Sequence, residues 1–249
     1  MKDFESMARM VTHEELNAMP GREIKEKRTR TSKIYDLGGG HYQAVLYPEP
    51  VHERNASGEW EEIDHTLTRN AEALESASPD LNARFAPGGA VTLTKGGYTL
   101  AWSVPKAQAV PPQRQEADSK TSFPRHEKAR ALESAVQYPD LLPGVDFTAH
   151  IQPGRFKDAL IFHTAQSVQP VEFRLRAPGL RLEQRPNGDV AAMDGDRAIF
   201  RLPAPVVTDN QGNPSPGSAH ALLEEVDRES WAWTVTLDAG FAAGAAYPI

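Results

Sequence analysis

The sequence predicts a mainly β protein: an antiparallel β-sandwich, or two packed sandwich-like halves, with a peripheral helix at the N-terminus. Two observations lead to this fold class. Apolar residues alternate with polar ones over about a dozen short runs. Turn-forming residues such as Asn187-Gly188 and Asp194-Gly195-Asp196 separate these runs. With 249 residues, the chain is long enough to bury a sizeable core.

The N-terminal segment, residues 1–31, is predicted to be a helical, mobile arm. Thr12–Glu15 fits a capping box, in which a Thr hydroxyl and a Glu carboxylate each satisfy a free backbone N–H. Only Leu16 and Met19 then supply apolar side chains, which is too narrow a stripe to dock a helix firmly. The basic run Arg22–Lys33 is interpreted as a solvated helix face.

Residues 32–104 are predicted to form the first β-rich half. In this half Tyr42–Tyr47 is apolar on both faces, a pattern that favours a central strand covered on both sides. The clearest hairpin follows, where Val91 and Leu93 precede the turn Lys95-Gly96-Gly97 and another alternating run comes after it.

Two further segments complete the predicted domain organisation. Residues 105–130 contain several prolines and charges but few apolar residues, and are interpreted as a linker or a long surface excursion. Residues 131–249 return to the strand period and form the predicted second β-rich half.

Composition argues against several classes of function. The formal net charge of -7 disfavours a nucleic-acid partner that would be held through its phosphates. The absence of cysteine excludes disulfides and thiolate chemistry. No apolar run approaches the ~20 residues of a membrane span, and the N-terminus lacks the apolar core of a signal peptide.

One group of residues could hold an acid/base or metal site. His52-Glu53 and Asp64-His65 lie on strands that can pair, with Glu49 and Glu62 nearby. No metal-ligand spacing such as H-x-E-x-H occurs, and His65 shares a face with apolar residues, which favours a structural histidine.

Other acidic residues give weaker signals. A carboxylate pair for glycoside hydrolysis could be drawn from several candidates: Glu49, Glu61, Glu62, Asp64 and Asp146. Asp194–Asp196 and Asp209–Asn213 offer oxygen ligands for calcium. Neither supplies the bidentate Glu that ends a twelve-residue calcium loop, so both are interpreted as turns. The sequence therefore assigns no catalytic, cofactor-binding or metal-ligating residue.

The four tryptophans leave two interpretations open. Trp60, Trp102, Trp231 and Trp233 could line a sugar platform if they were exposed. Three of them fall on alternating apolar faces, which favours a place in the core.

Several sequence motifs of the chain resemble those of a known family. One set of residues follows the pattern of a strand, a Pro-Val-His bend, a Gly-x-Trp turn and an Ile-Asp-x-Thr-Leu strand: Tyr42, Ala44, Pro50, Val51, His52, Gly58, Trp60, Ile63, Asp64, Thr66 and Leu67. Further motifs of the same family are resembled by four later segments: Gly97–Trp102, Pro143–Phe147, Lys157–Ile161 and Tyr247–Ile249. The sequence is similar to the N-terminal region of large bacterial wall-associated proteins of the Rhs/YD-repeat type and of DNRLRE-domain proteins. His65 stands where the Ile-Asp-x-Thr-Leu motif of these proteins usually has Asn.

This resemblance implies a structural β module, not an enzyme, from a secreted or cell-surface protein. Its partners would be the downstream domains of the same polypeptide, and it implies no cofactor or catalytic residue. We expect the chain to be a fragment that lacks its final strand.

Two alternatives to this function stay open. A carbohydrate- or wall-binding module, with cell-wall glycan as its partner, would need an exposed row of tryptophans. A small hydrolase would use His52, Asp64 and His65.

Overall fold

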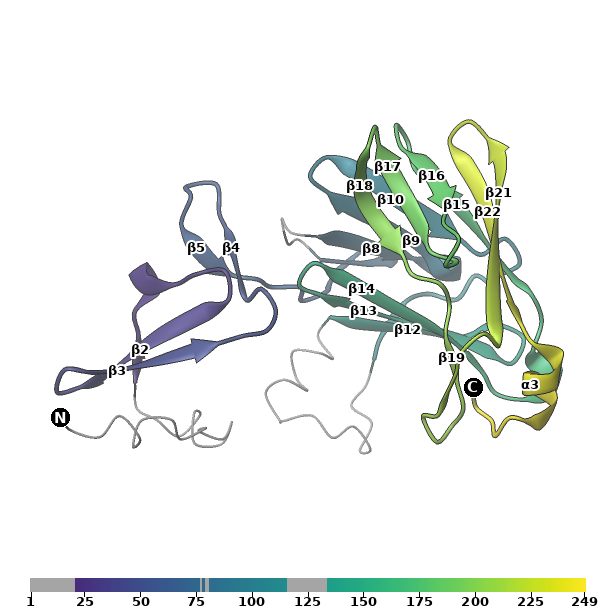
Figure 1. Cartoon of the computed structure of the whole chain (residues 1–249), viewed down its shortest axis with the longest axis horizontal. Coiled ribbons are helices and arrows are strands. Elements are labelled where there is room, and N and C mark those ends of the chain that lie inside the picture. The colour runs from purple at the N-terminus through teal and green to yellow at the C-terminus, as the bar shows by residue number, and fades with distance from the viewer. Residues whose placement is uncertain (1–20, 77, 79–80, 116–133) are drawn as a thin grey trace. The chain divides into compact units, whose positions relative to one another are not determined.

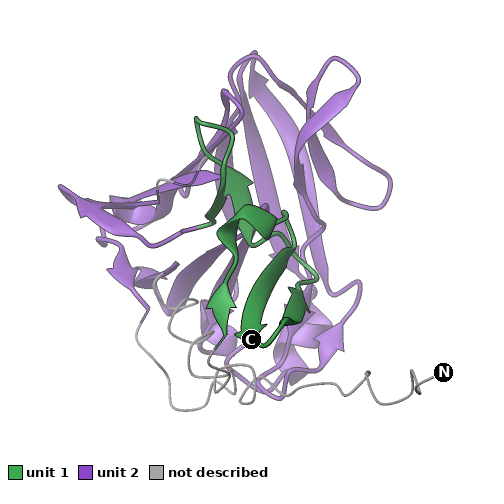
Figure 2. Ribbon diagram, turned by 90° about the vertical axis from the view of Figure 1, so that its left-hand side faces the viewer, with its two compact units in different colours: residues 1–63, 120–128 green, residues 64–119, 129–249 purple. Residues whose placement is uncertain are grey.

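The chain folds into two compact units (Figure 2). The computed structural model describes residues 21–76, 78, 81–115 and 134–249. The first unit comprises residues 1–63 with 120–128, and the second comprises residues 64–119 with 129–249. The predicted capping box at Thr12–Glu15 lies outside the described residues.

The first unit contains a small antiparallel sheet and a separate hairpin (Figure 1). The sheet has the order β1-β2-β3, with β1 at Arg22–Glu23, β2 at Ser32–Gly38 and β3 at His41–Leu46. β2 and β3 are joined by Gly38-Gly39-Gly40, whose φ angles of 80°, 62° and 81° suit glycine. The hairpin pairs β4 (His52–Arg54) with β5 (Trp60–Glu62).

Two predictions for this unit are wrong. Within residues 21–31 the expected helix is replaced by β1 and a single 3-10 turn at Lys25–Lys27, because Glu23 and Arg28 pair with each other and with more distant charges instead of lining a helix. β3 is an edge strand and not a covered central one, with Leu46 78% exposed.

The second unit is built on an eight-stranded antiparallel sheet with the order β21-β22-β15-β10-β9-β8-β7-β6. Its strands are β6 (Thr68–Asn70), β7 (Ala73–Glu75), β8 (Asn82–Ala86), β9 (Ala90–Lys95), β10 (Tyr98–Ser103), β15 (Val171–Arg176), β21 (Ala219–Asp227) and β22 (Ser230–Leu237). The predicted hairpin around Lys95-Gly96-Gly97 is the β9–β10 pair, in which Tyr98 lies opposite Lys95.

A four-stranded sheet packs against this large sheet. It has the order β11-β12-β13-β14, with β11 at Gln113–Arg114, β12 at Ala135–Leu142, β13 at Val145–Gln152 and β14 at Arg155–Phe162. The Phe156 ring of β14 lies 5.2 Å from the Trp102 ring of β10 and 6.1 Å from the Phe85 ring of β8, measured between centroids. The Tyr138 hydroxyl also donates to the Ala86 carbonyl at 2.9 Å.

Smaller elements complete the second unit. Three strands form a sheet of their own: β16 (Arg181–Gln184), β17 (Val190–Asp194) and β18 (Arg197–Leu202). β19 (Val207–Thr208) pairs with β20 (Pro214–Ser215). Short 3-10 turns occupy Pro87–Gly89 and Ala165–Ser167, and the helix α3 covers Ala239–Gly244, where the Asp238 carboxylate accepts from the Phe241 N–H at 2.8 Å.

The predicted mainly β, antiparallel fold class is confirmed. The strands are grouped differently from the expected halves 32–104 and 131–249, because β10 pairs with β15 and thereby places residues from both halves in one sheet. Of the expected linker 105–130, the described part includes β11, which pairs with β12; residues 116–130 lie outside the described residues.

Candidate functional site

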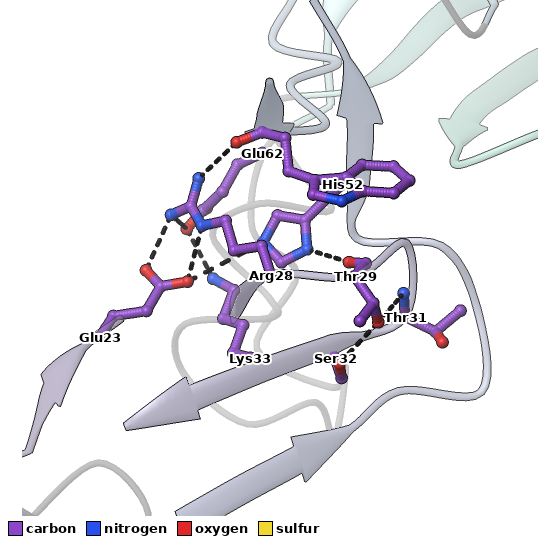
Figure 3. A network of polar contacts seen from close by, with 9 residues as sticks. Glu23, Arg28, Thr29, Thr31, Ser32, Lys33, His52 and Glu62 are labelled. Carbon is purple, nitrogen blue, oxygen red and sulfur yellow. Dashed lines mark hydrogen bonds and ion pairs between the residues drawn. The ribbon is translucent and has the colours of Figure 1, made fainter. Parts of the chain in front are cut away.

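A cluster of charged side chains lies in the first unit (Figure 3). Arg28 forms a bidentate ion pair with Glu23, in which its Nε and Nη2 each donate to a different carboxylate oxygen at 2.8 Å. Lys33 Nζ lies 2.6 Å from Glu62 Oε1, and Arg28 Nη2 lies 3.5 Å from the same oxygen. His52 completes the cluster beside Glu62, its opposite residue on the β4–β5 hairpin.

His52 is held in one orientation at the centre of this cluster. Its Nδ1 lies 2.6 Å from the Thr29 carbonyl oxygen, so Nδ1 carries the proton and Nε2 the lone pair. Nε2 faces Glu23 Oε1 at 4.0 Å and makes no hydrogen bond to a described residue. With 1% of its surface exposed, the imidazole is desolvated, and this burial lowers the pKa of His52.

The Glu23 carboxylate is held ionised by Arg28. The hydrogen bond from Arg28 lowers the pKa of Glu23, and the same pairing raises the pKa of Arg28. Only 8% of the Arg28 side chain and 17% of the Glu23 side chain are exposed, so the pair is largely removed from water.

Three side chains of this cluster lie close enough together to be considered as ligands of one metal ion. One ligand atom each from Glu23, His52 and Glu62 lie within 4.8 Å of one another, a donor set that suits zinc. Arg28 and Lys33, however, already neutralise the two carboxylates, and a metal cation would have to displace both. The cluster is therefore a closed ion-pair network that fixes β1, β2 and the β4–β5 hairpin to one another.

The three residues of the hydrolase hypothesis are divided between the units. His52 belongs to the first unit, whereas Asp64 and His65 belong to the second. Asp64 Oδ1 accepts the Thr66 N–H at 2.8 Å and so shapes a local turn. His65 is buried, with 7% of its surface exposed.

The remaining acidic candidates have structural partners. Glu61 accepts from the Asn55 amide at 2.7 Å. Asp146 accepts from the Asp140 N–H at 2.7 Å and lies 2.9 Å from His163 Nε2. Of the two calcium candidates, Asp209 accepts hydrogen bonds from the Asn213 side chain and from the Asn213 and Gln211 N–H groups within its own turn, and these bonds lower its pKa.

The tryptophans form no exposed row in the described residues. Trp102 and Trp231 are 7% and 5% exposed, and Trp233 is half-buried. The Arg54 guanidinium covers the Trp60 ring at 4.0 Å from its centroid. This burial counts against a glycan platform on the surface.

A cavity of about 610 Å³ lies within the second unit. It is bounded by strands of the large sheet, by β14 and by β18, and its lining is mostly apolar: Leu81, Leu93, Leu100, Trp102, Phe156, Phe173, Leu175, Ile199, Phe200, Leu202, Pro203 and Trp233. The charged residues of the lining are Lys95, Arg155, Lys157, Asp158 and Arg201.

Asp158 is the unusual member of this lining. It lies opposite the buried Ala149 in the β13–β14 register, so its side chain shares the inner face with Phe156 and Leu160. The cavity leaves the carboxylate accessible, yet protein surrounds it and the desolvation raises its pKa to about 6. Its hydrogen bond comes from its own backbone, and no other described residue pairs with it.

Sequence reasoning missed Asp158, and of the charged cluster it brought together only His52 and Glu62. Asp158 interrupts the alternating apolar positions Phe156, Leu160 and Phe162, and this interruption was a usable signal for an acid aimed at the core. Glu23, Arg28 and Lys33 left no comparable signal, because they lie far in sequence from His52 and Glu62.

The chain is similar to named bacterial proteins at low identity. It is 24% identical over 221 residues to the tRNA(Glu)-specific nuclease WapA of Bacillus subtilis subsp. natto, an alignment that covers 84% of the chain and 9% of that protein. It is 23% identical to the tRNA nuclease WapA of Bacillus subtilis strain 168, with the same coverage. It is 22% identical over 214 residues to a wall-associated protein of Geobacillus stearothermophilus, covering 82% of the chain and 81% of that protein.

These relatives bear on the expectations from sequence. The wall-associated relative fits the expected cell-surface context. The expectation that the chain is not an enzyme is contradicted, because relatives are named tRNA nucleases. The chain spans only 9% of the length of those nucleases.

Other comparisons add no family. No protein-family model matches the chain. No solved structure matches it. In the described part of the chain, no helix has the length and apolar character needed to cross a membrane.

Proposed function

We propose that this chain is a β module of a large wall-associated surface protein of the Rhs/YD-repeat type, joined to downstream domains of the same polypeptide. One observation carries the proposal: 84% of the chain aligns with only 9% of the WapA relatives. A segment of this size within a long protein is a domain-sized building block. The wall-associated relative, which the chain matches over 81% of its length, supports the same location.

Cell fractionation of the source organism tests this location. An antibody raised against the purified chain should detect its antigen in the wall fraction, and brief protease treatment of intact cells should remove the signal. A cytosolic enzyme serves as the control that must survive the same treatment. An antigen that stays with the cytosolic marker and resists protease in intact cells would contradict the proposal.

Cleavage of tRNA is the second candidate function, because three relatives are named for it. The groups that such chemistry needs meet in the first unit: His52 and Glu23 as acid and base, and Arg28 as a cation for phosphate. Burial of His52 and the pairing of Arg28 oppose this use.

The purified chain should therefore be incubated with tRNA beside the variant His52→Gln. Cleavage by the wild type and its loss in the variant would assign the activity to this cluster. Intact tRNA with both proteins would contradict this candidate without touching the proposed location.

A further inference from the structure

We propose that the cavity of the second unit is a binding site for a neutral saccharide of one or two pyranose rings, oriented by Asp158. The inference goes beyond the surface location proposed above, since it stands on the lining of the cavity alone. It also replaces the exposed tryptophan platform, which the described residues do not form, with a partly open cavity.

The size of the cavity suits a small ligand. Ligand pockets commonly have volumes of about 300–1,000 Å³ and are lined mainly by apolar and aromatic side chains with a few polar groups. The cavity of about 610 Å³ falls within this range and is lined in that way. It lies among strands of packed sheets, so its walls are set by the fold.

The aromatic walls suit the apolar face of a sugar ring. Trp102 and Phe156 meet edge to face, with ring planes at 81°. Trp233 packs beside Phe173 with centroids 5.9 Å apart, and both line the same cavity. Phe156 and Trp233 are partly exposed and offer fixed apolar ring surface at little cost in conformational entropy, whereas Trp102 and Phe173, 7% and 5% exposed, support them from behind. The C–H face of a pyranose covers such a surface.

The charged residues select among ligand classes. A wholly apolar ligand would bury the Asp158 carboxylate without a hydrogen bond, which is costly. A cationic ligand would meet Asp158 but also the four basic residues of the lining: Lys95, Arg155, Lys157 and Arg201. An anionic ligand would meet the basic residues but would also place its charge beside the Asp158 carboxylate, which protein already desolvates.

A polyol with an apolar face fits this lining better than an apolar, a cationic or an anionic ligand, because it can contact the apolar walls and also form hydrogen bonds with the charged groups. Its hydroxyl groups donate to the Asp158 carboxylate, which no other described residue occupies. Each hydroxyl also accepts, so the same ligand can take a hydrogen bond from Lys95 at the boundary of the cavity. Asp158 is therefore the group that fixes the orientation of the ring.

Isothermal titration calorimetry on the whole purified chain tests the proposal. The probes are N,N′-diacetylchitobiose, cellobiose and maltose, with choline chloride and octanoate as the cationic and the apolar anionic comparisons. We expect at least one disaccharide to bind, and neither comparison compound to bind. Binding should also change the fluorescence of the chain, because Trp102 and Trp233 line the cavity.

Two variants locate the site. Asp158→Asn keeps the shape of the side chain and should weaken disaccharide binding about tenfold, the usual cost of losing a hydrogen bond to a charged group. Asp196→Asn removes an acid from the exposed β17–β18 turn and should bind as the wild type does. A thermal melt of each variant confirms that it is folded.

Three results would overturn the proposal. The first is the absence of binding by all three disaccharides, and the second is binding of choline or octanoate in their place. The third is equal affinity of the wild type and a folded Asp158→Asn variant. A failure here leaves the proposed wall location standing, because cell fractionation measures that location independently.

Discussion

The two units differ in the kind of side chain that they mainly bury. Among residues 21–63, the buried side chains are all polar or charged: Arg28, Ser32, Lys33 and His52. In the described part of the second unit, the buried side chains are mostly apolar and form an extensive core that includes Phe85, Tyr138 and Phe147. Apolar burial is non-directional and scales with area, whereas buried ion pairs stabilise only while every partner is present.

Both units expose large apolar side chains, including Val206 and Leu222 in the second, so the contrast lies in what each unit buries. In the first unit, Tyr42 and Leu46 are 58% and 78% exposed, although both lie on a β-strand. The first unit therefore derives its order from specific charged partners, and the second from the amount of apolar surface removed from water. Variants that remove one kind of buried contact at a time test this distinction.

The largest effect should come from the apolar core. Phe85→Ala removes a fully buried ring that stacks on Phe156, and we expect the free energy of unfolding of the second unit to fall by about 4 kcal/mol. Urea denaturation followed by tryptophan fluorescence measures this loss. Tyr42→Ala, at an exposed aromatic of the first unit, is the control and should cost less than about 0.5 kcal/mol. Equal losses for both variants would remove the contrast between the units.

A smaller effect should come from the charged cluster. Arg28→Met leaves Glu23 without its bidentate partner, and we expect the first unit to lose about 3 kcal/mol. Hydrogen exchange of the β2 and β4 amides, followed by mass spectrometry, reports on this unit separately. The double variant Arg28→Met/Glu23→Leu should recover much of the loss, because no uncompensated carboxylate remains from this pair.

An exposed ion pair supplies the control for this prediction. Arg176 Nη2 lies 3.8 Å from Glu229 Oε2, and the two side chains are 69% and 48% exposed. Arg176→Met should therefore cost less than about 0.5 kcal/mol. If Arg28→Met is as mild as this control, the cluster does not hold the first unit together.

Local signals in the sequence predicted local structure well. The β9–β10 hairpin forms around Lys95-Gly96-Gly97, and Asn187-Gly188 lies in the turn between β16 and β17, because glycine at positive φ directs these turns wherever they occur. The pairing of β10 with β15 joins residues about seventy positions apart, and no turn signal specifies it.

The candidate sites depend on such distant pairings. In the sequence, Arg28 and Lys33 look like ordinary surface charges, and only the meeting of β2 with the β4–β5 hairpin buries them. Asp158 could be placed on the face of Phe156 from the alternation alone. That this face lines a cavity follows from the packing of two sheets, which a single run of residues does not specify.

The smallest predicted effect is a pH dependence of opposite sign in the two units. The pKa of His52 is lowered in the folded chain, so the unfolded chain binds more protons below its ordinary pKa of 6.5, and acidification from pH 7 to 5 destabilises the first unit. The pKa of Asp158 is raised to about 6 from 3.8, so the folded chain binds more protons between these values and acidification stabilises the second unit.

Variants separate these two contributions from other titrating groups. His150 in the second unit also has a lowered pKa, caused by burial, and opposes Asp158, so wild type and variant must be compared at each pH. Asp158→Asn should be more stable than the wild type at pH 7 by roughly 1 kcal/mol, since water in the cavity screens the carboxylate, and the difference should shrink by pH 5. His52→Gln should remove the acid-induced increase in hydrogen exchange at β4. An advantage of Asp158→Asn that is the same at both pH values would mean that Asp158 does not titrate in this window, and the opposed signs of the two units would then be lost.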